Sequence, residues 1–135
     1  MPVKTEKPEL ACEVEKVEHV IKLAIEKSLS KNMKDKIESI YRWKQAVALL
    51  ELEVFAKKYN PPKAFVETVK NLLEYCVEYC LKKSTASYPG CWRYEVLTPF
   101  NNWGEQFWKY YVDNRARFEN FLLKYVAEKY GWKPL

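Results

Sequence analysis

The sequence predicts an all-α protein in which four long helices form one elongated domain. Two observations lead to this fold class. Apolar residues recur every three or four positions over long stretches, which is the spacing of a helix with one buried face. This pattern is interrupted at only a few places, near residues 28–32, 60–62 and 84–102. A length of 135 residues suits a single domain, so we expect residues 1–135 to form one helical unit.

The first helix is predicted to begin at Pro8. Proline is tolerated in the first turn of a helix, and the acidic Glu9 that follows it complements the positive end of the helix dipole. The apolar face of this helix consists of Leu10, Val14, Val17, Ile21 and Ala24. We expect it to end at a break over residues 28–32.

The second helix is predicted over residues 33–59, and the tripeptide Asn60, Pro61 and Pro62 ends it. Neither proline has a backbone N–H, and each disfavours helix in the residue before it. Asn60 is expected to cap the third helix as well, with Pro61 at its first position. The third helix then fades near residues 82–84, after an apolar face formed by Phe65, Val69, Leu72, Cys76 and Val77.

Residues 84–102 show no helical pattern and are predicted to be a long connection, in which residues 92–97 form a short extended stretch. A connection of this length in a small domain is often functional. Asn101 or Asn102 is expected to cap the fourth helix. Gly131, followed by Trp132 and Pro134, is expected to end that helix in a left-handed turn with a hydrophobic contact.

The composition points away from enzymes. The chain has one histidine, His19, and neither of the glycine motifs that cradle phosphates, so we predict no catalytic residues and no cofactor. Nineteen Lys and sixteen Glu crowd out Arg, Asp and Gln, which is typical of a hyperthermophile protein. The polar N-terminus and the lack of a long apolar run predict neither a signal peptide nor a membrane span.

The four cysteines allow three interpretations: a disulfide, buried thiols or a metal site. In a hyperthermophile cytosol disulfides do occur, and one that ties down the long connection through Cys91 is the favoured arrangement. A C-x3-C spacing without a nearby histidine is not the usual zinc pattern, so no metal ligands are predicted. The cysteines considered are Cys12, Cys76, Cys80 and Cys91.

Basic and aromatic residues alternate in two places, and the net charge of +5 suits a polyanionic partner. The first place is the segment 31–44, where Lys and Arg could neutralise phosphates; the alternative is a solvated face with Trp43 in the core. The second lies on the fourth helix, where Asp113 and Glu119 could instead form ordinary ion pairs. The candidate nucleic-acid-binding residues are Lys31, Lys34, Lys36, Arg42, Lys44, Arg115 and Arg117.

The chain resembles the major coat proteins of filamentous and rod-shaped viruses of hyperthermophilic archaea in size, helix layout and composition. That resemblance implies a structural protein whose copies, identical or paralogous, wrap duplex DNA through backbone contacts in a virion. Residues 1–60 would then be a DNA-wrapping arm, and residues 61–135 a helix bundle with subunit contacts. The acidic residues of the first helix depart from this pattern. The alternative is a helical protein–protein interaction module, or a small subunit of a larger complex, in the cytoplasm of such a host and without nucleic-acid binding.

Overall fold

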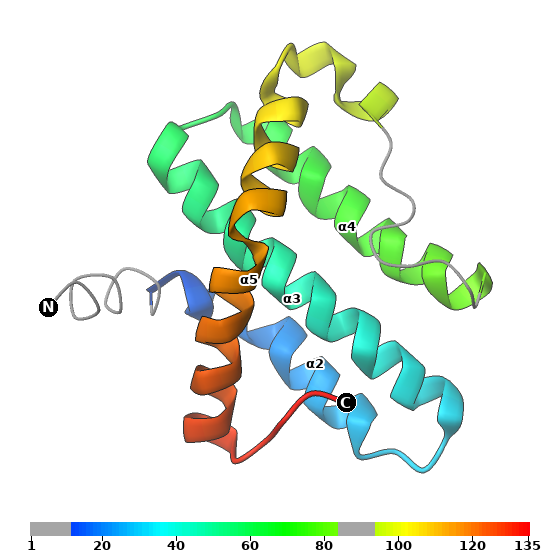
Figure 1. The fold of residues 1–135 in the computed structure, drawn as a ribbon. Coiled ribbons are helices and arrows are strands. Elements are labelled where there is room, and N and C mark those ends of the chain that lie inside the picture. The colour runs from blue at the N-terminus through cyan, green and yellow to red at the C-terminus, as the bar shows by residue number, and fades with distance from the viewer. Residues whose placement is uncertain (1–11, 84–93) are drawn as a thin grey trace, which may run out of the picture.

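A computed structural model describes residues 12–83 and 94–135, and within these ranges the chain is helical with no strand, which confirms the all-α prediction (Figure 1). The elements follow one another as α2 (Glu18–Ser28), α3 (Met33–Tyr59), α4 (Lys63–Lys83), the 3₁₀ helix η1 (Tyr94–Phe100) and α5 (Trp103–Tyr130). Of the elements in the described ranges, α3, α4 and α5 each have more than twenty residues, and α2 is shorter.

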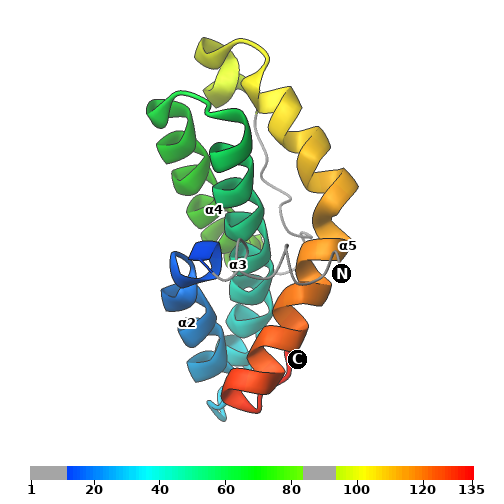
Figure 2. The same ribbon diagram turned by 90° about the vertical axis from the view of Figure 1, so that its left-hand side faces the viewer.

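The central helix is α3, which packs against α2, α4 and α5. Figure 2 shows α2, α3 and α4 side by side, with α5 on one side of them. Phe55 of α3 lies in the middle of the core, where its ring contacts Phe107 and Trp103 at centroid distances of 5.4 Å and 6.0 Å. The described part of residues 1–60 is thus an integral part of the bundle and does not stand apart from it as an arm.

The predicted first helix is interrupted within the described residues. Residues 12–15 are helical, a turn follows at residues 16–17, and α2 begins at Glu18. In this turn the N–H of Val17 donates to the carbonyl of Val14 at 2.9 Å, three residues back rather than four. Val14 and Val17 are both buried, so this tighter turn keeps two apolar side chains in the core. The predicted start at Pro8 lies outside the described residues.

The limits of α3 and its end at Asn60 confirm the prediction, but the expectation that Asn60 also caps the next helix was wrong. Asn32 caps the start of α3, its side chain accepting a hydrogen bond from the N–H of Lys34 at 2.8 Å. Asn60 ends α3 in the left-handed conformation, with φ of 51°, instead of capping α4. The next helix starts only at Lys63, because Pro61 and Pro62 form the link between the two helices.

The connection before α5 contains a helix where an extended stretch was predicted. Residues 94–100 form η1, which places Leu97 in the core against Gly104. A Cβ atom at position 104 would lie 3.1 Å from the Leu97 side chain, so Leu97 would have to shift by a few tenths of an ångström to admit it. Asn102 precedes α5 but makes no capping hydrogen bond with its side chain. Residues 92 and 93 of the predicted stretch lie outside the described residues.

The predicted end of α5 is confirmed. Gly131 adopts φ of 59°, and the N–H of Trp132 donates to the carbonyl of Val126 at 3.4 Å. The indole of Trp132 then packs edge-on against Trp43 at 5.9 Å and donates to Ser28 Oγ at 2.8 Å. The C-terminal residues therefore close the end of the bundle over α2 and α3.

Candidate nucleic-acid interface

Arg42 does not belong to the basic surface predicted from the sequence. Its Nε donates to Glu38 at 3.1 Å, and its Nη1 donates to the two oxygens of Glu74 at 2.9 Å and 3.0 Å. Gln45 joins the same network, accepting from Arg42 and donating to Glu74. With 12% of its side chain exposed, Arg42 connects α3 with α4, and the carboxylates of Glu38 and Glu74 neutralise its charge. The sequence does not reveal this pair, because Glu74 is 32 residues away along the chain.

The three lysines nearest the start of α3 fit the prediction better. Lys31 and Lys34 are exposed and Lys36 is half-buried, and none of them forms an ion pair with another described residue. The nearby Asp35 is occupied instead by Lys27, at 3.6 Å, and by the hydroxyl of Ser30, at 2.8 Å. This corner of the molecule therefore carries three positive charges that no described acid neutralises.

Lys44 of α3 and Arg115 of α5 meet in space. Both are exposed, and they line one small hollow of about 90 Å³ between the two helices, together with Val47, Tyr111 and Glu119. We call this the Lys44 hollow. Neither Lys44 nor Arg115 is within ion-pair distance of any described carboxylate, although Glu119 lines the same hollow. One oxygen of Glu119 accepts a hydrogen bond from the indole of Trp43 at 3.2 Å. The fold thus joins two candidates from opposite halves of the sequence.

Arg117 lies on the other flank of α5. It lines a wider hollow of about 390 Å³ with Lys58, Tyr59 and Lys109, which we call the Tyr59 hollow; Asp113 is the one acid in its lining. The guanidinium of Arg117 lies 4.6 Å from the centre of the Phe118 ring. Tyr59 is 44% exposed, and the ammonium of Lys58 lies 5.5 Å from its ring centre. Sequence reasoning missed Lys58, although the dipeptide of lysines before an aromatic residue was a usable signal.

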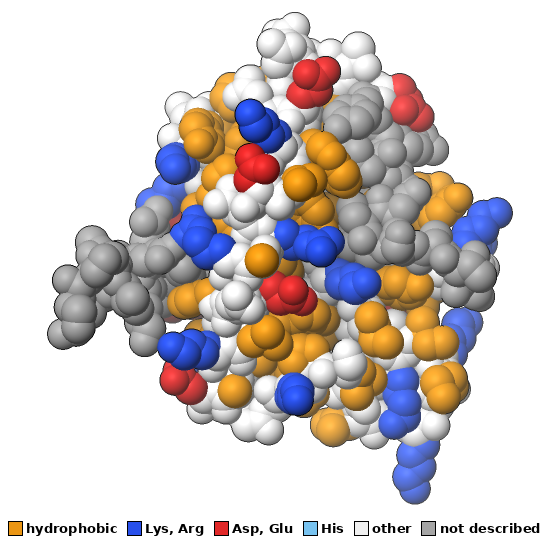
Figure 3. All heavy atoms as spheres, viewed as in Figure 1, with side chains coloured by type: hydrophobic (Ala, Val, Ile, Leu, Met, Phe, Trp, Pro, Cys, Tyr) orange, Lys and Arg blue, Asp and Glu red, His pale blue; other side chains and the backbone are white. Residues whose placement is uncertain are grey.

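The two hollows make α5 a ridge with cations on both sides. On the face of the molecule that carries α5, Figure 3 shows Lys and Arg side chains on both sides of this helix. The ridge itself is uncharged in its middle part, where Val112 is 57% exposed and Ala116 is also exposed. Positively charged side chains therefore lie on both sides of an exposed apolar strip along α5.

Glu51 is an unusual residue near this face, and no pattern in the sequence selects it. It is fully buried, and neither carboxylate oxygen has a hydrogen-bond partner among the described residues. Burial raises the pKa of Glu51 to about 9; Arg115 opposes this rise and Glu119 adds to it. The Glu51 carboxyl is accordingly protonated and neutral at pH 7. The same burial raises the pKa of the neighbouring Tyr111, and Arg115 opposes that shift as well.

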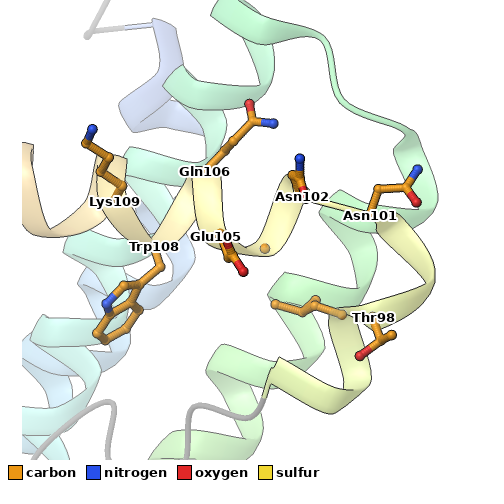
Figure 4. Close-up of a pocket in the computed structure, with 9 residues that line it drawn as sticks. Thr98, Asn101, Asn102, Glu105, Gln106, Trp108 and Lys109 are labelled. Atoms are coloured by element: carbon orange, nitrogen blue, oxygen red, sulfur yellow. The ribbon is translucent and has the colours of Figure 1, made fainter.

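A further hollow, of about 840 Å³, is not a convergent site. It lies where η1 meets the start of α5. Figure 4 shows Asn101, Asn102 and Gln106 on one side of the chain, whereas Thr98 and Trp108 point to the other side. Because these polar groups do not face one another, we assign no ligand to this hollow.

The cysteines, metal ligands and membrane spans discussed from the sequence can be compared with the described residues. Cys76 is disulfide-bonded, whereas Cys12 and Cys80 carry thiols, and Cys91 lies outside the described residues. Across residues 12–83 and 94–135, no three His, Cys, Asp or Glu side chains are grouped so as to hold a metal ion. None of the described helices has the length and apolar character that crossing a bilayer requires.

Comparisons with protein-family models, with curated proteins and with solved structures find no match to this chain. The assignment of function therefore depends on the geometry and charge of the surface described above.

Proposed function

We propose that this protein is a structural nucleic-acid-binding protein that oligomerises along duplex DNA through backbone contacts, as a viral coat or DNA-packaging protein does. The observation that carries this proposal is the position of the cations on both flanks of α5. Lys44 and Arg115 line one flank, and Lys58 and Lys109 line the other. Arg42, which is neutralised within the bundle, is excluded from this surface.

The dimensions of α5 suit a duplex. A helix with its side chains is about 10–12 Å wide, and the major groove of B-DNA is about 12 Å wide. A ridge of this width brings cations on its two flanks toward phosphates of both strands. Its middle crest offers Val112 and Ala116, which cannot hydrogen-bond to base edges. We therefore expect contacts to phosphates without base readout.

The α2–α3 corner extends this surface along the helix. Lys34 and Lys36 lie about 80° to either side of Lys44 around the α3 axis and roughly 12–15 Å from it along that axis. The set of Lys31, Lys34, Lys36, Lys44 and Arg115 would release about one counterion for each phosphate that it neutralises. If all five contact phosphates, log K falls with log salt with a slope on the order of −4 to −5.

The experiment is fluorescence anisotropy of the full chain with 20- and 60-base-pair duplexes over a salt series. A bound amount that grows with duplex length, and an affinity that falls steeply with salt, supports the proposal. Binding that is absent at low salt would refute it for this chain. A matched single-stranded RNA and an RNA duplex, measured in parallel, identify the kind of nucleic acid.

A second candidate function, a protein–protein interaction module, is favoured by one specific observation. Leu29 and Met33, at the α2–α3 corner, are 75% and 69% exposed, and Ile37, one turn further, is 38% exposed. Aliphatic side chains exposed together are typical of an interaction surface. Replacing Leu29 and Met33 by Ser should abolish self-association under the first proposal. Under the second, no nucleic acid binds and the chain forms a discrete complex through this corner.

A further inference from the structure

We propose that the Tyr59 hollow binds one unpaired nucleotide of a single-stranded nucleic acid, with the base against the ring of Tyr59 and the phosphate at Lys58 and Lys109. This inference goes beyond the proposed function, which needs only contacts to the backbone of a duplex. It does not depend on that function, because a base that is paired and stacked inside a duplex cannot enter a hollow in a protein surface.

The Tyr59 hollow has the size of a ligand site. Its volume of about 390 Å³ falls at the lower end of the range of roughly 300–1,000 Å³ that is usual for small-molecule pockets. Its lining comes from α3 and α5, which pack directly on each other, so its walls belong to two helices held by the core of the bundle. A hollow of this size accommodates one nucleotide and not a run of stacked bases.

The ring of Tyr59 is both exposed and held in place. Tyr59 is 44% exposed. Its ring lies 4.9 Å from that of Phe55 and 6.0 Å from that of Tyr110, which meets it edge-on at 82°. Phe55 and Tyr110 also line the hollow. A ring fixed by neighbouring rings loses little freedom when a base stacks on it, and every base has a face that can stack.

Cations lie close to this ring. The ammonium of Lys58 is 5.5 Å from the ring centre, and Lys109 and Arg117 also line the hollow. With Asp113 as the one acid, the lining carries a net charge of +2. Neither Lys58 nor Lys109 forms an ion pair with another described residue. Because a sugar joins the base of a nucleotide to its phosphate, a ring and cations that lie this close together can bind both parts at once.

A side-chain amide in the hollow can meet the edge of the base. Gln106 is part of the lining, and Figure 4 shows it on the same side of α5 as Lys109, with Trp108 on the opposite side. An amide both donates and accepts hydrogen bonds, so it can match different bases. An exposed ring beside cations is the arrangement by which proteins bind single strands of many sequences. The Lys44 hollow does not have this arrangement, because Tyr111, the aromatic residue in its lining, is only 5% exposed.

The experiment is fluorescence anisotropy of the full chain with two labelled strands of eight nucleotides, oligothymidylate and a strand with the same backbone but without bases. The two strands carry the same charge, so the difference between their affinities measures the contribution of the bases. Wild type should bind oligothymidylate about tenfold more tightly, as expected for the stacking of one base on an aromatic ring. Oligouridylate of the same length, measured in parallel, shows whether the nucleotide is taken from RNA or from DNA.

Four variants, whose folding is checked by circular dichroism, test the residues of the site. Tyr59→Ala should remove the preference for the strand with bases, whereas Tyr59→Phe keeps the ring and should retain it. Lys58→Gln should weaken the binding of both strands, because it removes a phosphate contact that both share. Tyr75→Ala is the matched control, since Tyr75 of α4 is 43% exposed and does not line the hollow. It should bind both strands as wild type does.

Three results would overturn the inference: equal affinity of wild type for the two strands, a base preference that persists in Tyr59→Ala, or an equal loss of this preference in Tyr75→Ala. A 60-base-pair duplex, measured with the same proteins, separates the inference from the proposed function. If the duplex binds and the single strands show no base preference, the proposed function stands and this inference fails. If the single strands bind with the expected pattern and the duplex does not bind, the inference stands and the proposed function fails.

Discussion

One guanidinium nitrogen of Arg42, Nη1, donates to both carboxylate oxygens of Glu74, at 2.9 Å and 3.0 Å. This contact joins the middle of α3 to the middle of α4, and Glu38 holds the other side of the guanidinium at 3.1 Å. A residue that looks, in the sequence, like part of a basic surface is therefore a structural connection between helices.

Arg42→Gln should destabilise the fold without removing nucleic-acid binding. It leaves the half-buried Glu38 and Glu74 without their cation, which costs about 1–2 kcal/mol of unfolding free energy, a value reduced by the exposure of Glu74. Urea denaturation measures the loss. Lys44→Gln is the matched control, expected to unfold as wild type does while binding DNA more weakly. Full stability of Arg42→Gln combined with lost DNA binding would restore Arg42 to the interface.

The stability of the fold at acid pH should depend on the contact between Arg42 and Glu74. Burial alone would raise the pKa of Glu74, but hydrogen bonds from Gln45 and Arg42 outweigh it and hold the pKa below its ordinary value of 4.5. The stabilisation is therefore present above pH 4.5 and is lost as the pH falls through the lower value. Unfolding curves of wild type and Arg42→Gln should converge toward acid pH. Curves that stay equally far apart would contradict this assignment.

Glu51 should make stability depend on pH in the opposite direction. Its pKa rises from 4.5 to about 9 on folding, so between these values the folded chain holds a proton that the unfolded chain has lost. The free energy of unfolding should fall by up to about 1.4 kcal/mol per pH unit in this range and level off above pH 9. The free energy of unfolding of Glu51→Gln should not fall with pH in this way. The stability of Glu51→Gln relative to wild type should therefore rise from pH 5 to pH 8. Equal pH dependence of the two proteins would contradict a neutral buried carboxyl.

The helical pattern predicted most of the fold because it reports local burial. The limits of α3 and the stop at Gly131 follow from caps and from the position of apolar residues along the chain. The 3₁₀ helix η1 could not be predicted from this pattern, because it depends on the tertiary contact between Leu97 and Gly104. The turn before α2 contains neither glycine nor proline, so no local signal marked it.

The candidate interface was predictable only in part for the same reason. Exposed lysines such as Lys31 and Lys34 can be selected from charge patterns, since their surroundings are local. Arg42 and Glu51 have their character fixed by residues on α4 and α5 that are far away in the sequence. Whether a charged residue is neutralised, buried or available depends on such partners, and a linear pattern does not contain them.

The C-terminal contact should contribute to stability. Trp132 packs against Trp43 and donates to Ser28, and Lys129 holds Glu18 of α2 at 2.8 Å. Trp132→Ala removes a half-buried indole and its hydrogen bond, which should cost about 2–3 kcal/mol in the free energy of unfolding. Ser28→Ala removes the acceptor of the Trp132 indole together with the hydrogen bond that the Ser28 hydroxyl donates to the carbonyl of Ile25, and it should cost about 1 kcal/mol. If Trp132→Ala unfolds at the same urea concentration as wild type, the C-terminal contact does not close the bundle.

The central claim, that cations of α3 and α5 contact nucleic-acid phosphates, is tested most directly by charge reversal. The double variant Lys44→Glu and Arg115→Glu is compared with Lys22→Glu and Lys63→Glu, two exposed lysines of α2 and α4 that form no ion pair with a described residue. Both double variants change the net charge by the same amount, so a general loss of electrostatic attraction to DNA affects them equally. Anisotropy with a 60-base-pair duplex should show binding abolished in the first double and only weakened in the second. Equal loss in both doubles, or retained binding in the first, would contradict the interface between α3 and α5.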